Sequence, residues 1–317
     1  MKIGFIGLGN VGGKLAGSLL RNGFDLTVRD LNQEISRPFL DNGAKWGESP
    51  KQIAETVELI ITCLPNPAAS ASVMEADDGV LAGISSGKIW VEMSTTDEEE
   101  VKRLGAKVKT MGGEALDCPV SGGCHRAATG NISIFIGGER SSFEKILPVM
   151  KVLGRRILHT GVLGSASILK VMTNYLATAN LVTLCEALTT AKKAGMDLST
   201  TYEAIRISSG NSFVHETESQ VILNGSRDIN FTMDLVLKDI SLFQAIAERV
   251  GVPLEVSPLL IDIFKDGEER YGSREWSPNI VRRLEEACDT QVLASGFPTE
   301  MVDNEPEVSG SEVVARV

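Results

Sequence analysis

The sequence predicts an α/β domain with a doubly wound, mostly parallel sheet, followed by an all-α domain. From residue 1 to about 160, candidate strands and helices alternate, which is typical of a parallel sheet with helices on both faces. Strand patterns then stop, and apolar residues recur at helical spacing to about residue 290. The first strand also runs directly into a glycine-rich turn, between that strand and an amphipathic helix.

The predicted strands of the first domain are short apolar runs bounded by polar or turn-forming residues. They cover residues 2–6, 25–29, 57–63, 88–93, 114–118, 132–136 and 155–159, with helices at 11–21, 97–109 and 140–152 between them. The last two strands are expected to extend the sheet, with antiparallel pairing as one option. This order places the first domain at residues 1–162.

The second domain is predicted to be all-helical over residues 163–290. Residues 165–194 contain neither Gly nor Pro and predict one helix of up to 30 residues, which ends at Gly195. Further helices are predicted at 199–208, 213–224, 232–250, 256–271 and 277–290. The long first helix is apolar around more of its surface than one core face needs, which indicates a subunit interface in a homodimer or homotetramer. Residues 291–317 are rich in Gly, Pro, Ser and acids and are expected to form a disordered acidic tail.

Composition excludes several classes of partner. Of the 317 residues 43% are hydrophobic and 23% charged, as in ordinary globular domains. The net charge of −11 argues against nucleic acid and anionic membranes, but not against a small anion bound at a local positive site. No apolar run reaches the length of a membrane span, and a strand from residue 2 leaves no signal peptide, so we expect a cytoplasmic protein. The five cysteines form no C-x-x-C pair and are interpreted as free thiols, not as disulfides or zinc ligands.

The turn after the first strand has the pattern G-x-G-x-x-G. Its first glycine permits a tight turn, the second lets backbone approach a pyrophosphate, and the third lets a helix pack close to the strand. The N–H groups at the start of that helix then point at the phosphates. An ordinary glycine-rich turn is the alternative, but the position between a strand and an amphipathic helix favours a dinucleotide site in a Rossmann-type domain. The predicted contacts are Gly7, Leu8, Gly9, Asn10, Val11 and Gly12.

Asp30 ends the second strand, about twenty residues after the turn, where a carboxylate accepts hydrogen bonds from the ribose of a dinucleotide. A carboxylate there repels the 2′-phosphate of NADP, so the sequence favours NAD, with NADP as the less favoured cofactor. Arg29 keeps the second option open, because an Arg near this strand end can bind that phosphate. Its side chain alternates with that of Asp30 along the strand and can point elsewhere. A turn or helix cap is the alternative role of Asp30.

Two further loops follow predicted strands, and open α/β sheets bind ligands at the carboxyl ends of their strands. One is Cys63–Pro67, in which two prolines make a stiff loop suited to a ring face. The other is Glu92–Thr96, which offers hydroxyls and backbone donors. A plain turn and a helix N-cap are the alternatives, and the cap is compatible with a cofactor contact.

A nicotinamide enzyme needs a group that moves the proton of the substrate hydroxyl. Zinc is not indicated, because His125, His159 and His215 form no ligand pair; a Tyr-x-x-x-Lys pair does not occur either. Lys170 and Asn174 stand at i and i+4 near the start of the long predicted helix, so they share one face. A Lys in an apolar stretch is expected to have a pKa lowered by desolvation, which suits proton exchange near neutral pH. The alternative is a surface Lys beside a solvated Asn.

Five segments, in the same order, resemble the β-hydroxyacid dehydrogenase family, which includes 3-hydroxyisobutyrate dehydrogenase and tartronate semialdehyde reductase. The opening I-G-F-I-G-L-G-N-V-G and the T-C-L-P-N loop match that family. Asp117–Gly123 looks like its substrate signature D-x-P-V-S-G-G, and Gly164–Asn174 looks like its catalytic G-x-x-x-x-x-K-x-x-x-N. Phe231–Asp239 is similar to F-x-x-x-L-x-x-K-D. The resemblance covers residues 2 to about 290 and implies a second domain like the C-terminal domain of 6-phosphogluconate dehydrogenase.

The resemblance implies an NAD-dependent oxidoreductase that interconverts a 3-hydroxy acid and its semialdehyde or 3-oxo acid. The sequence itself indicates no metal site. Lys170 would be the general acid/base, and Asn174 would orient the substrate in the cleft between the domains. The implied substrate-binding residues are Ser121, Gly122, Gly123, Asn174 and Asp239, the first three acting largely through backbone N–H groups on the acid group. The implied cofactor contacts beyond the glycine turn and Asp30 are Leu64, Pro65, Thr95 and Lys238.

Some residues depart from the family's pattern. His125 and Arg126 follow the Gly-Gly pair, and they either add positive charge near the substrate anion or are surface residues. Tyr175 stands where the family commonly has Asn or an apolar residue, and Asn211 and Ser212 are candidate pocket residues. Together they suggest an unusual acid, such as a larger or sulfonated one.

Three other functions fit parts of the sequence. An imine reductase of the same fold is disfavoured by Lys170, and a decarboxylating phosphogluconate-type enzyme by the short chain. A catalytically silent NAD-binding protein is disfavoured by the complete set of Lys170, Asn174 and Ser121–Gly123. Turnover of NAD with a panel of 3-hydroxy acids separates these possibilities.

Overall fold

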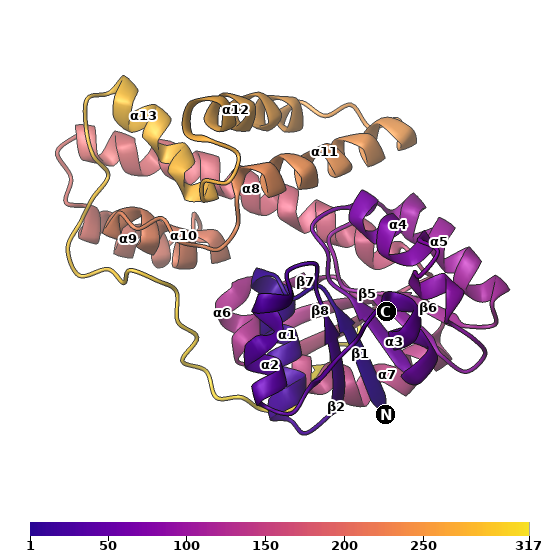
Figure 1. Ribbon diagram of the computed structural model, residues 1–317. Coiled ribbons are helices and arrows are strands. Elements are labelled where there is room, and N and C mark those ends of the chain that lie inside the picture. The colour runs from indigo at the N-terminus through magenta and orange to yellow at the C-terminus, as the bar shows by residue number, and fades with distance from the viewer. Residues whose placement is uncertain (317) are drawn as a thin grey trace. The chain divides into compact units, whose positions relative to one another are not determined.

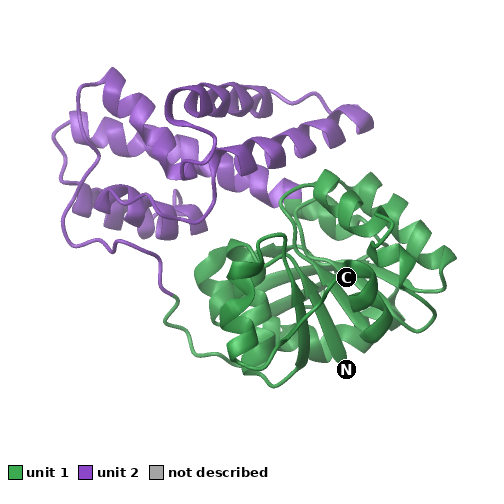
Figure 2. Cartoon of the chain, in the orientation of Figure 1, with its two compact units in different colours: residues 1–170, 303–317 green, residues 171–302 purple. Residues whose placement is uncertain are grey.

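The computed structural model describes residues 1–316, which form two compact units (Figure 2). Unit 1 comprises residues 1–170 together with the C-terminal segment from residue 303. Unit 2 comprises Val171–Val302. The chain therefore leaves unit 1 within a long helix, forms unit 2, and returns to unit 1 at its C-terminal end.

Unit 1 is built on one sheet, with ten strands in the described part of the chain (Figure 1). The strands are β1 (Lys2–Ile6), β2 (Asp25–Arg29), β3 (Lys45–Trp46), β4 (Leu59–Thr62), β5 (Ile89–Glu92), β6 (Glu114–Asp117), β7 (Val120–Ser121), β8 (Ile132–Gly137), β9 (Gly154–Gly161) and β10 (Ser311–Glu312). Their order is β10-β9-β8-β6-β5-β4-β1-β2-β3, and β7 pairs with β8. All neighbours from β3 to β6 are parallel. The predicted mostly parallel sheet is confirmed.

The two sheet-extending strands behave differently from each other. Strand β8 is antiparallel to β6, at the pair Asp117–Gly137. Strand β9 runs parallel to β8, so the antiparallel option holds for only one of the two pairings. The helix α7 (Arg140–Leu153) between β8 and β9 supplies the crossover that a parallel pair requires.

Helices cover both faces of this sheet (Figure 1). In unit 1 they are α1 (Asn10–Arg21), α2 (Arg37–Asp41), α3 (Pro50–Thr56), α4 (Pro67–Glu75), α5 (Glu98–Thr110), α6 (Gly123–Ala128) and α7 (Arg140–Leu153), with short 3₁₀ turns at Gln33–Ser36 and Val80–Ala82. Because successive strand residues face opposite sides, Phe5 of β1 packs with Leu15 of α1 in one core. Ile6 of β1 packs with Ile53 of α3 in the other. The doubly wound architecture is therefore confirmed.

Unit 2 is helical and has its own apolar core, to which Leu188, Ile240 and Phe264 contribute. Its helices are α8 (Ser165–Lys193, which begins in unit 1), α9 (Leu198–Arg206), α10 (Phe213–Asn224), α11 (Met233–Val250), α12 (Val256–Tyr271) and α13 (Arg282–Ala287), with a 3₁₀ turn at Ser277–Val281. The side chains of Asp197 and Ser212 cap α9 and α10. The predicted all-helical second domain is confirmed.

The structure differs from the expectation that no segment is long and apolar enough to span a membrane. An 18-residue window of α8 has a mean hydropathy of 1.2, so by length and composition alone this helix could cross a membrane. The sequence shows no unbroken apolar run of that length because Asn and Thr interrupt it, yet the mean over the window still reaches this value. A core helix passes the same test, and α8 contributes Leu181, Leu184 and Leu188 to the core of unit 2.

The expected disordered tail is not observed, because residues 291–316 pack on both units in turn. The backbone N–H of Ala294 donates to the Leu223 carbonyl, and Val292 is fully buried. From residue 303 the chain runs along unit 1 and adds β10 to the sheet, parallel to β9. The acids that suggest disorder by composition have specific partners: Glu312, for example, pairs with Arg140. Acids paired with basic side chains do not repel one another as those of a free tail do.

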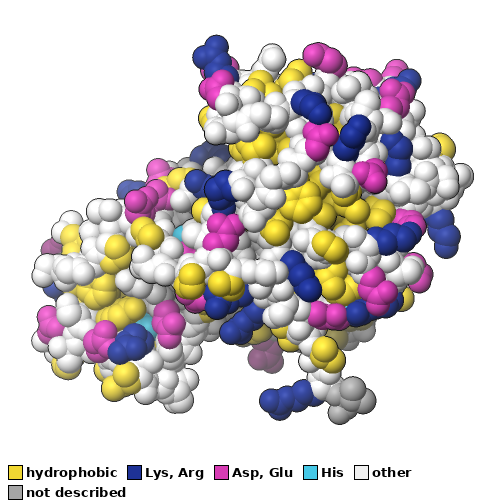
Figure 3. All heavy atoms as spheres, turned by 90° about the horizontal axis from the view of Figure 1, so that it is seen from below, with side chains coloured by type: hydrophobic (Ala, Val, Ile, Leu, Met, Phe, Trp, Pro, Cys, Tyr) yellow, Lys and Arg dark blue, Asp and Glu magenta, His cyan; other side chains and the backbone are white. Residues whose placement is uncertain are grey.

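Acidic and basic side chains are interspersed on the face shown in Figure 3, with hydrophobic side chains between them. No single sign of charge covers that face. Ion pairs such as Arg103–Glu75 and Lys145–Glu114 neutralise part of the acidic side chains.

Candidate active site

The glycine-rich turn has the geometry that each of its glycines predicts. Gly7 has φ +100°, and a Cβ there would lie 2.2 Å from the Cys63 carbonyl oxygen. A Cβ at Gly12 would lie 2.1 Å from the Gly7 carbonyl oxygen, so the first turn of α1 passes directly over the strand end. A Cβ at Gly9 would meet nothing within 4 Å. Two glycines are required by protein packing, and the third faces open space where a pyrophosphate fits.

Asp30 holds this turn from the end of β2. One carboxylate oxygen accepts a hydrogen bond from the Leu8 N–H at 2.7 Å, and the other accepts one from the Asn32 N–H at 2.9 Å. Asp30 therefore does cap the turn, as the alternative interpretation expected. Each carboxylate oxygen can still accept another hydrogen bond, for example from a ribose hydroxyl. Arg29 Nη1 donates to the carbonyls of Gly47 and Glu48, which ties the guanidinium to the segment after β3.

The two loops that follow β4 and β5 are tied to each other. The Leu64 N–H donates to Ser94 Oγ at 2.7 Å, and the Ser94 N–H donates to Glu92 Oε1 at 2.9 Å. The Ser94 hydroxyl also bonds this carboxylate. Glu92 is buried, and burial raises the pKa of its carboxyl. Pro65 is exposed and Thr95 half-buried at the same carboxyl edge of the sheet, where a dinucleotide has access to them.

The Ser121–Gly123 loop joins β7 to α6. Gly122 and Gly123 have φ values of +131° and +86°, which L side chains rarely adopt. A Cβ at Gly123 would also lie 2.8 Å from the His125 ring. The loop thus has two consecutive residues with positive φ at the start of α6, next to Ser121.

The two basic residues after this loop have protein surroundings. Arg126 Nη2 lies 3.5 Å from Glu305 Oε1 of the C-terminal segment, so the two side chains form an ion pair. Burial, followed by the charge of Arg126, lowers the pKa of His125. These contacts favour the surface reading of Arg126 and a neutral His125.

Lys170 lies in the second turn of α8, and its side chain is buried, with 8% exposed. The start of this helix is held by Asp117, the last residue of β6. Asp117 accepts hydrogen bonds from the Gly164 N–H at 2.8 Å, the Ser167 N–H at 2.7 Å and the Ser167 hydroxyl at 2.9 Å. The sequence motif includes Asp117 but does not show that it holds the start of α8. Its position at the carboxyl end of a predicted strand is the one feature of the sequence that indicates a role in the site.

The remaining predicted polar residues meet in unit 2. Asn174 donates through Nδ2 to Asp239 Oδ2, and Lys238 Nζ lies 2.6 Å from Asp239 Oδ1. Because α8 is continuous, Asn174 is one helical turn beyond Lys170. Tyr175 stacks on Phe243 at 4.3 Å between ring centroids, which gives it a packing role.

The second-domain candidates Asn211 and Ser212 have local partners. Asn211 donates to Glu216 Oε1 at 2.6 Å, and Ser212 accepts from the His215 N–H at 3.0 Å as the cap of α10. His159 and His215 each bond a backbone carbonyl through Nε2. All five cysteines are free thiols.

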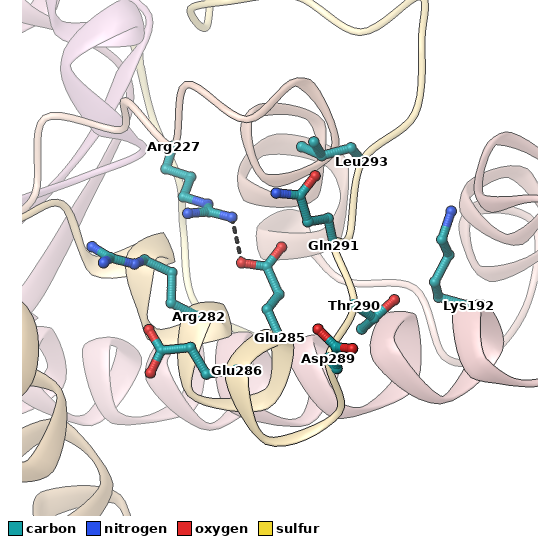
Figure 4. A pocket seen from close by; sticks show the side chains of 9 residues that line it. All are labelled: Lys192, Arg227, Arg282, Glu285, Glu286, Asp289, Thr290, Gln291 and Leu293. Atoms are coloured by element: carbon teal, nitrogen blue, oxygen red, sulfur yellow. Dashed lines mark hydrogen bonds and ion pairs between the residues drawn. The ribbon is translucent and has the colours of Figure 1, made fainter.

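A surface hollow in unit 2 contains none of these residues (Figure 4). Arg227 crosses it to pair with Glu285 at 2.6 Å, and Glu285 also accepts the Val292 N–H. These bonds fasten residues after α13 to the loop after α10. The hollow is therefore explained by structural contacts.

Comparisons with known proteins show the family to which the two parts of the chain are similar. A family model described as the NAD-binding domain of 6-phosphogluconate dehydrogenase matches residues 2–161, and one described as NAD-binding of NADP-dependent 3-hydroxyisobutyrate dehydrogenase matches residues 164–284. The 2-(hydroxymethyl)glutarate dehydrogenase of Eubacterium barkeri is 32% identical over 92% of this chain and 97% of its own. The mitochondrial 3-hydroxyisobutyrate dehydrogenase of Rattus norvegicus is 28% identical over 83% and 81%.

The same architecture occurs in a solved structure. The crystal structure of a 3-hydroxyisobutyrate dehydrogenase from Salmonella typhimurium superposes with a TM-score of 0.82 and covers 89% of this chain and 99% of its own. Its sequence identity is 24%, so this likeness shows the fold.

Proposed function

Because the chain belongs to the β-hydroxyacid dehydrogenase family of oxidoreductases, we propose that it interconverts a 3-hydroxy acid and its semialdehyde or 3-oxo acid. The observation that carries the proposal is the buried Lys170 on a helix start anchored by Asp117. Unit 1 holds this Lys together with the glycine turn and the Ser121–Gly123 loop. A proton carrier, a dinucleotide turn and an anion loop are the parts that this reaction needs.

Lys170 is assigned the proton transfer. In the oxidation direction, its uncharged Nζ accepts the proton of the substrate hydroxyl while the carbon beside that oxygen gives up hydride. A bound nicotinamide dinucleotide supplies the C4 acceptor for the hydride. In the reduction direction, the ammonium of Lys170 returns the proton to the carbonyl oxygen. A positioned acid/base of this kind contributes about 10²–10⁴ to the rate.

Substrate binding is assigned to the loop before α6. Its N–H groups and the Ser121 hydroxyl donate to the acid group, which fixes the distance from that group to the reacting hydroxyl. Asn174, held by Asp239, is assigned to substrate orientation because it is one turn from Lys170 on α8. Lys238 keeps the cofactor contact that the family resemblance implies. The proposed substrates are small anions.

We assign NAD as the cofactor, with NADP less favoured. Asp30 places a carboxylate at the end of β2, where a 2′-phosphate would be repelled. Arg29, the residue that would favour NADP, donates to two backbone carbonyls instead. The dinucleotide contacts are those of the glycine turn with Leu64, Pro65 and Thr95.

Two properties complete the proposal. The helix α8 exposes Met172 and Leu176, one turn apart, and apolar side chains at this spacing support self-association into a homodimer or homotetramer. Five free thiols support a reducing, cytoplasmic setting.

The experiment is a panel of carboxylic and sulfonic 3-hydroxy acids, assayed with NAD and with NADP. We expect reduction of NAD with at least one acid, at a kcat/KM above that with NADP. An imine reductase would instead reduce cyclic imines and leave every acid unchanged. Binding of NAD without turnover of either class would identify a silent binding protein.

A further inference from the structure

We infer that Asp117 is a positioning residue for the catalytic Lys: its carboxylate fixes the first turn of α8, and through it the direction of Lys170. The inference rests on the proposed function of Lys170. Asp117 is not assigned contact with substrate or cofactor. It acts through the helix that carries the reacting group.

Three hydrogen bonds carry the inference, and all of them lie in unit 1. Asp117 Oδ1 accepts from the Gly164 N–H, and Oδ2 accepts from both the N–H and the hydroxyl of Ser167. Ser167 precedes Lys170 by three residues, so it lies on the neighbouring turn of the same helical face. A carboxylate at a helix start satisfies N–H groups that have no partner within the helix. Here that carboxylate comes from a strand 47 residues earlier, so it also ties the helix to the sheet.

The place of the carboxylate allows little movement. Asp117 is fully buried. Gly137, its partner across the β6–β8 pair, has no side chain, and a Cβ there would lie 2.4 Å from Asp117 Oδ1. The same Cβ would lie 2.8 Å from Ser165 Oγ. The absence of a side chain at Gly137 therefore leaves room for the Asp117 carboxylate and for Ser165 at the start of α8, but not for an additional methyl group.

The charge of Asp117 matches the helix it holds. The start of α8 carries the positive end of the helix dipole, which stabilises a carboxylate. Burial raises the pKa of Asp117 above its usual value, and the hydrogen bonds from Gly164 and Ser167 oppose that rise without cancelling it. A neutral amide at this position keeps the shape but loses the charge and one acceptor. It would hold the helix less firmly.

A second buried carboxylate, on the neighbouring strand, has a different set of partners. Glu92 is the register partner of Asp117 on the neighbouring strand β5. It bonds Ser94, and Ser94 accepts from Leu64, so it holds the two loops that follow β4 and β5. Two adjacent strand ends thus hold two different parts of the site. Of these two carboxylates, Asp117 is the one that bonds the helix of Lys170.

The test compares Asp117→Asn, Ser167→Ala and Ser167→Thr with the wild-type enzyme. We expect Asp117→Asn to lower kcat by about 100-fold, the loss that accompanies a misplacement of about 1 Å. The pH–rate profile should shift, and NAD affinity measured by calorimetry should stay within about twofold. Ser167→Ala should lose about fivefold in kcat, roughly the 1 kcal/mol of one hydrogen bond, and Ser167→Thr, which keeps the hydroxyl, should lose less.

Asp197→Asn is the matched control. Asp197 accepts from the N–H and hydroxyl of Thr200 at the start of α9, the same pair of bonds at a helix without site residues. Its kcat should equal that of the wild type. A kcat for Asp117→Asn within twofold of wild type, with an unchanged pH profile, would overturn the inference. If Asp117→Asn does not fold, equal kcat values for Ser167→Ala and Ser167→Thr would overturn it.

A readout independent of turnover separates this inference from the proposed function. Reductive ¹³C-methylation gives each Lys an NMR signal that follows its own titration, and Lys170→Arg identifies the signal of Lys170. We expect that signal to titrate differently in Asp117→Asn and unchanged in Asp197→Asn. Such a change without turnover of any hydroxy acid would refute the proposed reaction and keep the positioning role. Turnover with an unchanged Lys170 signal would refute the positioning role alone.

Discussion

Gly137 and Asp117 face each other across the antiparallel pair β6–β8, and a Cβ on Gly137 would lie 2.4 Å from Asp117 Oδ1. Real Cβ atoms do not approach an oxygen so closely, so the carboxylate occupies space that only glycine leaves. This one contact connects a small residue on β8 to the helix start that carries Lys170.

Gly137→Ala should therefore displace Asp117 and lower kcat by about 10-fold or more. The cause is movement of the helix start, so NAD affinity should change little. Steady-state kinetics and calorimetric titration with NAD check both parts. Gly17→Ala is the control, because a Cβ on Gly17 in α1 meets only the end of Arg21 at 3.6 Å. Equal kcat values for the two alanine variants would contradict the expectation.

Asp30→Ala should raise the KM for NAD by about 10-fold, the worth of a hydrogen bond to a charged group, and narrow the preference for NAD over NADP. The Leu8 N–H also loses its acceptor, which loosens the glycine turn. Kinetics with both cofactors measure the change. Asp25→Ala, at the other end of β2, removes only the exposed ion pair with Lys45 and should leave the preference intact. If Asp30→Ala kept the wild-type preference for NAD over NADP, Asp30 would not determine the cofactor specificity.

Deletion of residues 303–317 should destabilise unit 1 by about 2 kcal/mol, the worth of about two hydrogen bonds. At about 2–4 °C per kcal/mol in a domain of 150–250 residues, its melting temperature should fall by about 4–8 °C. The deletion removes β10 and the bonds from Asp303 to Asn131 and Thr129. Exposed pairs such as Arg155–Glu305 contribute little individually. Calorimetry measures the shift. A chain that ends after Val313 keeps these bonds and should melt as the full chain does; equal melting of both truncated chains would show that the segment stabilises nothing.

Glu218→Gln should stabilise unit 2 at alkaline pH. Burial raises the pKa of Glu218 from 4.5 to about 8, and Oε2 is buried without a hydrogen-bond partner among the described residues. The folded state therefore favours the protonated acid, and this stabilisation is present below pH 4.5 and lost as the pH rises through 8. Glu218→Gln should have a higher melting temperature than wild type above pH 8 and a similar one near pH 5.

The control for this pH dependence is Glu203→Gln on α9. Glu203 is 55% exposed and pairs with Arg206 on the surface, so its substitution should shift the melting temperature by a similar small amount at both pH values. Parallel melting curves against pH for wild type and Glu218→Gln would show that Glu218 is ionised in the folded protein throughout.

Sequence patterns predict the long elements well, and the physical reason is their periodicity. The predicted bounds of β1, β2, α10 and α12 match the structure. In α12, for example, the buried residues Leu260, Phe264 and Gly267 recur at helical spacing. The two-residue strands β3 and β7 contain no period, so no pattern can identify them. The short helices α3 and α4 are marked mainly by their caps, Ser49 and Asn66.

Contacts between distant segments set the limit of prediction. The role of each glycine in the turn is predictable, because steric fit at a strand–helix turn is a local property. The pairing of Glu312 with Arg140 joins residues 172 apart, so composition alone suggests a free tail. Asp117 is visible as part of a motif, but its bonds to Gly164 and Ser167 appear only when β6 and α8 are folded together.

The central claim is that Lys170 carries the proton in hydride transfer between a 3-hydroxy acid and NAD. Its most direct test is the steady-state rate of NAD reduction by Lys170→Ala, with NAD affinity measured by calorimetry on the same protein. We predict a loss of kcat of about 10²–10⁴ with NAD affinity unchanged. A kcat within a few-fold of wild type in a folded, NAD-binding Lys170→Ala protein would contradict the account.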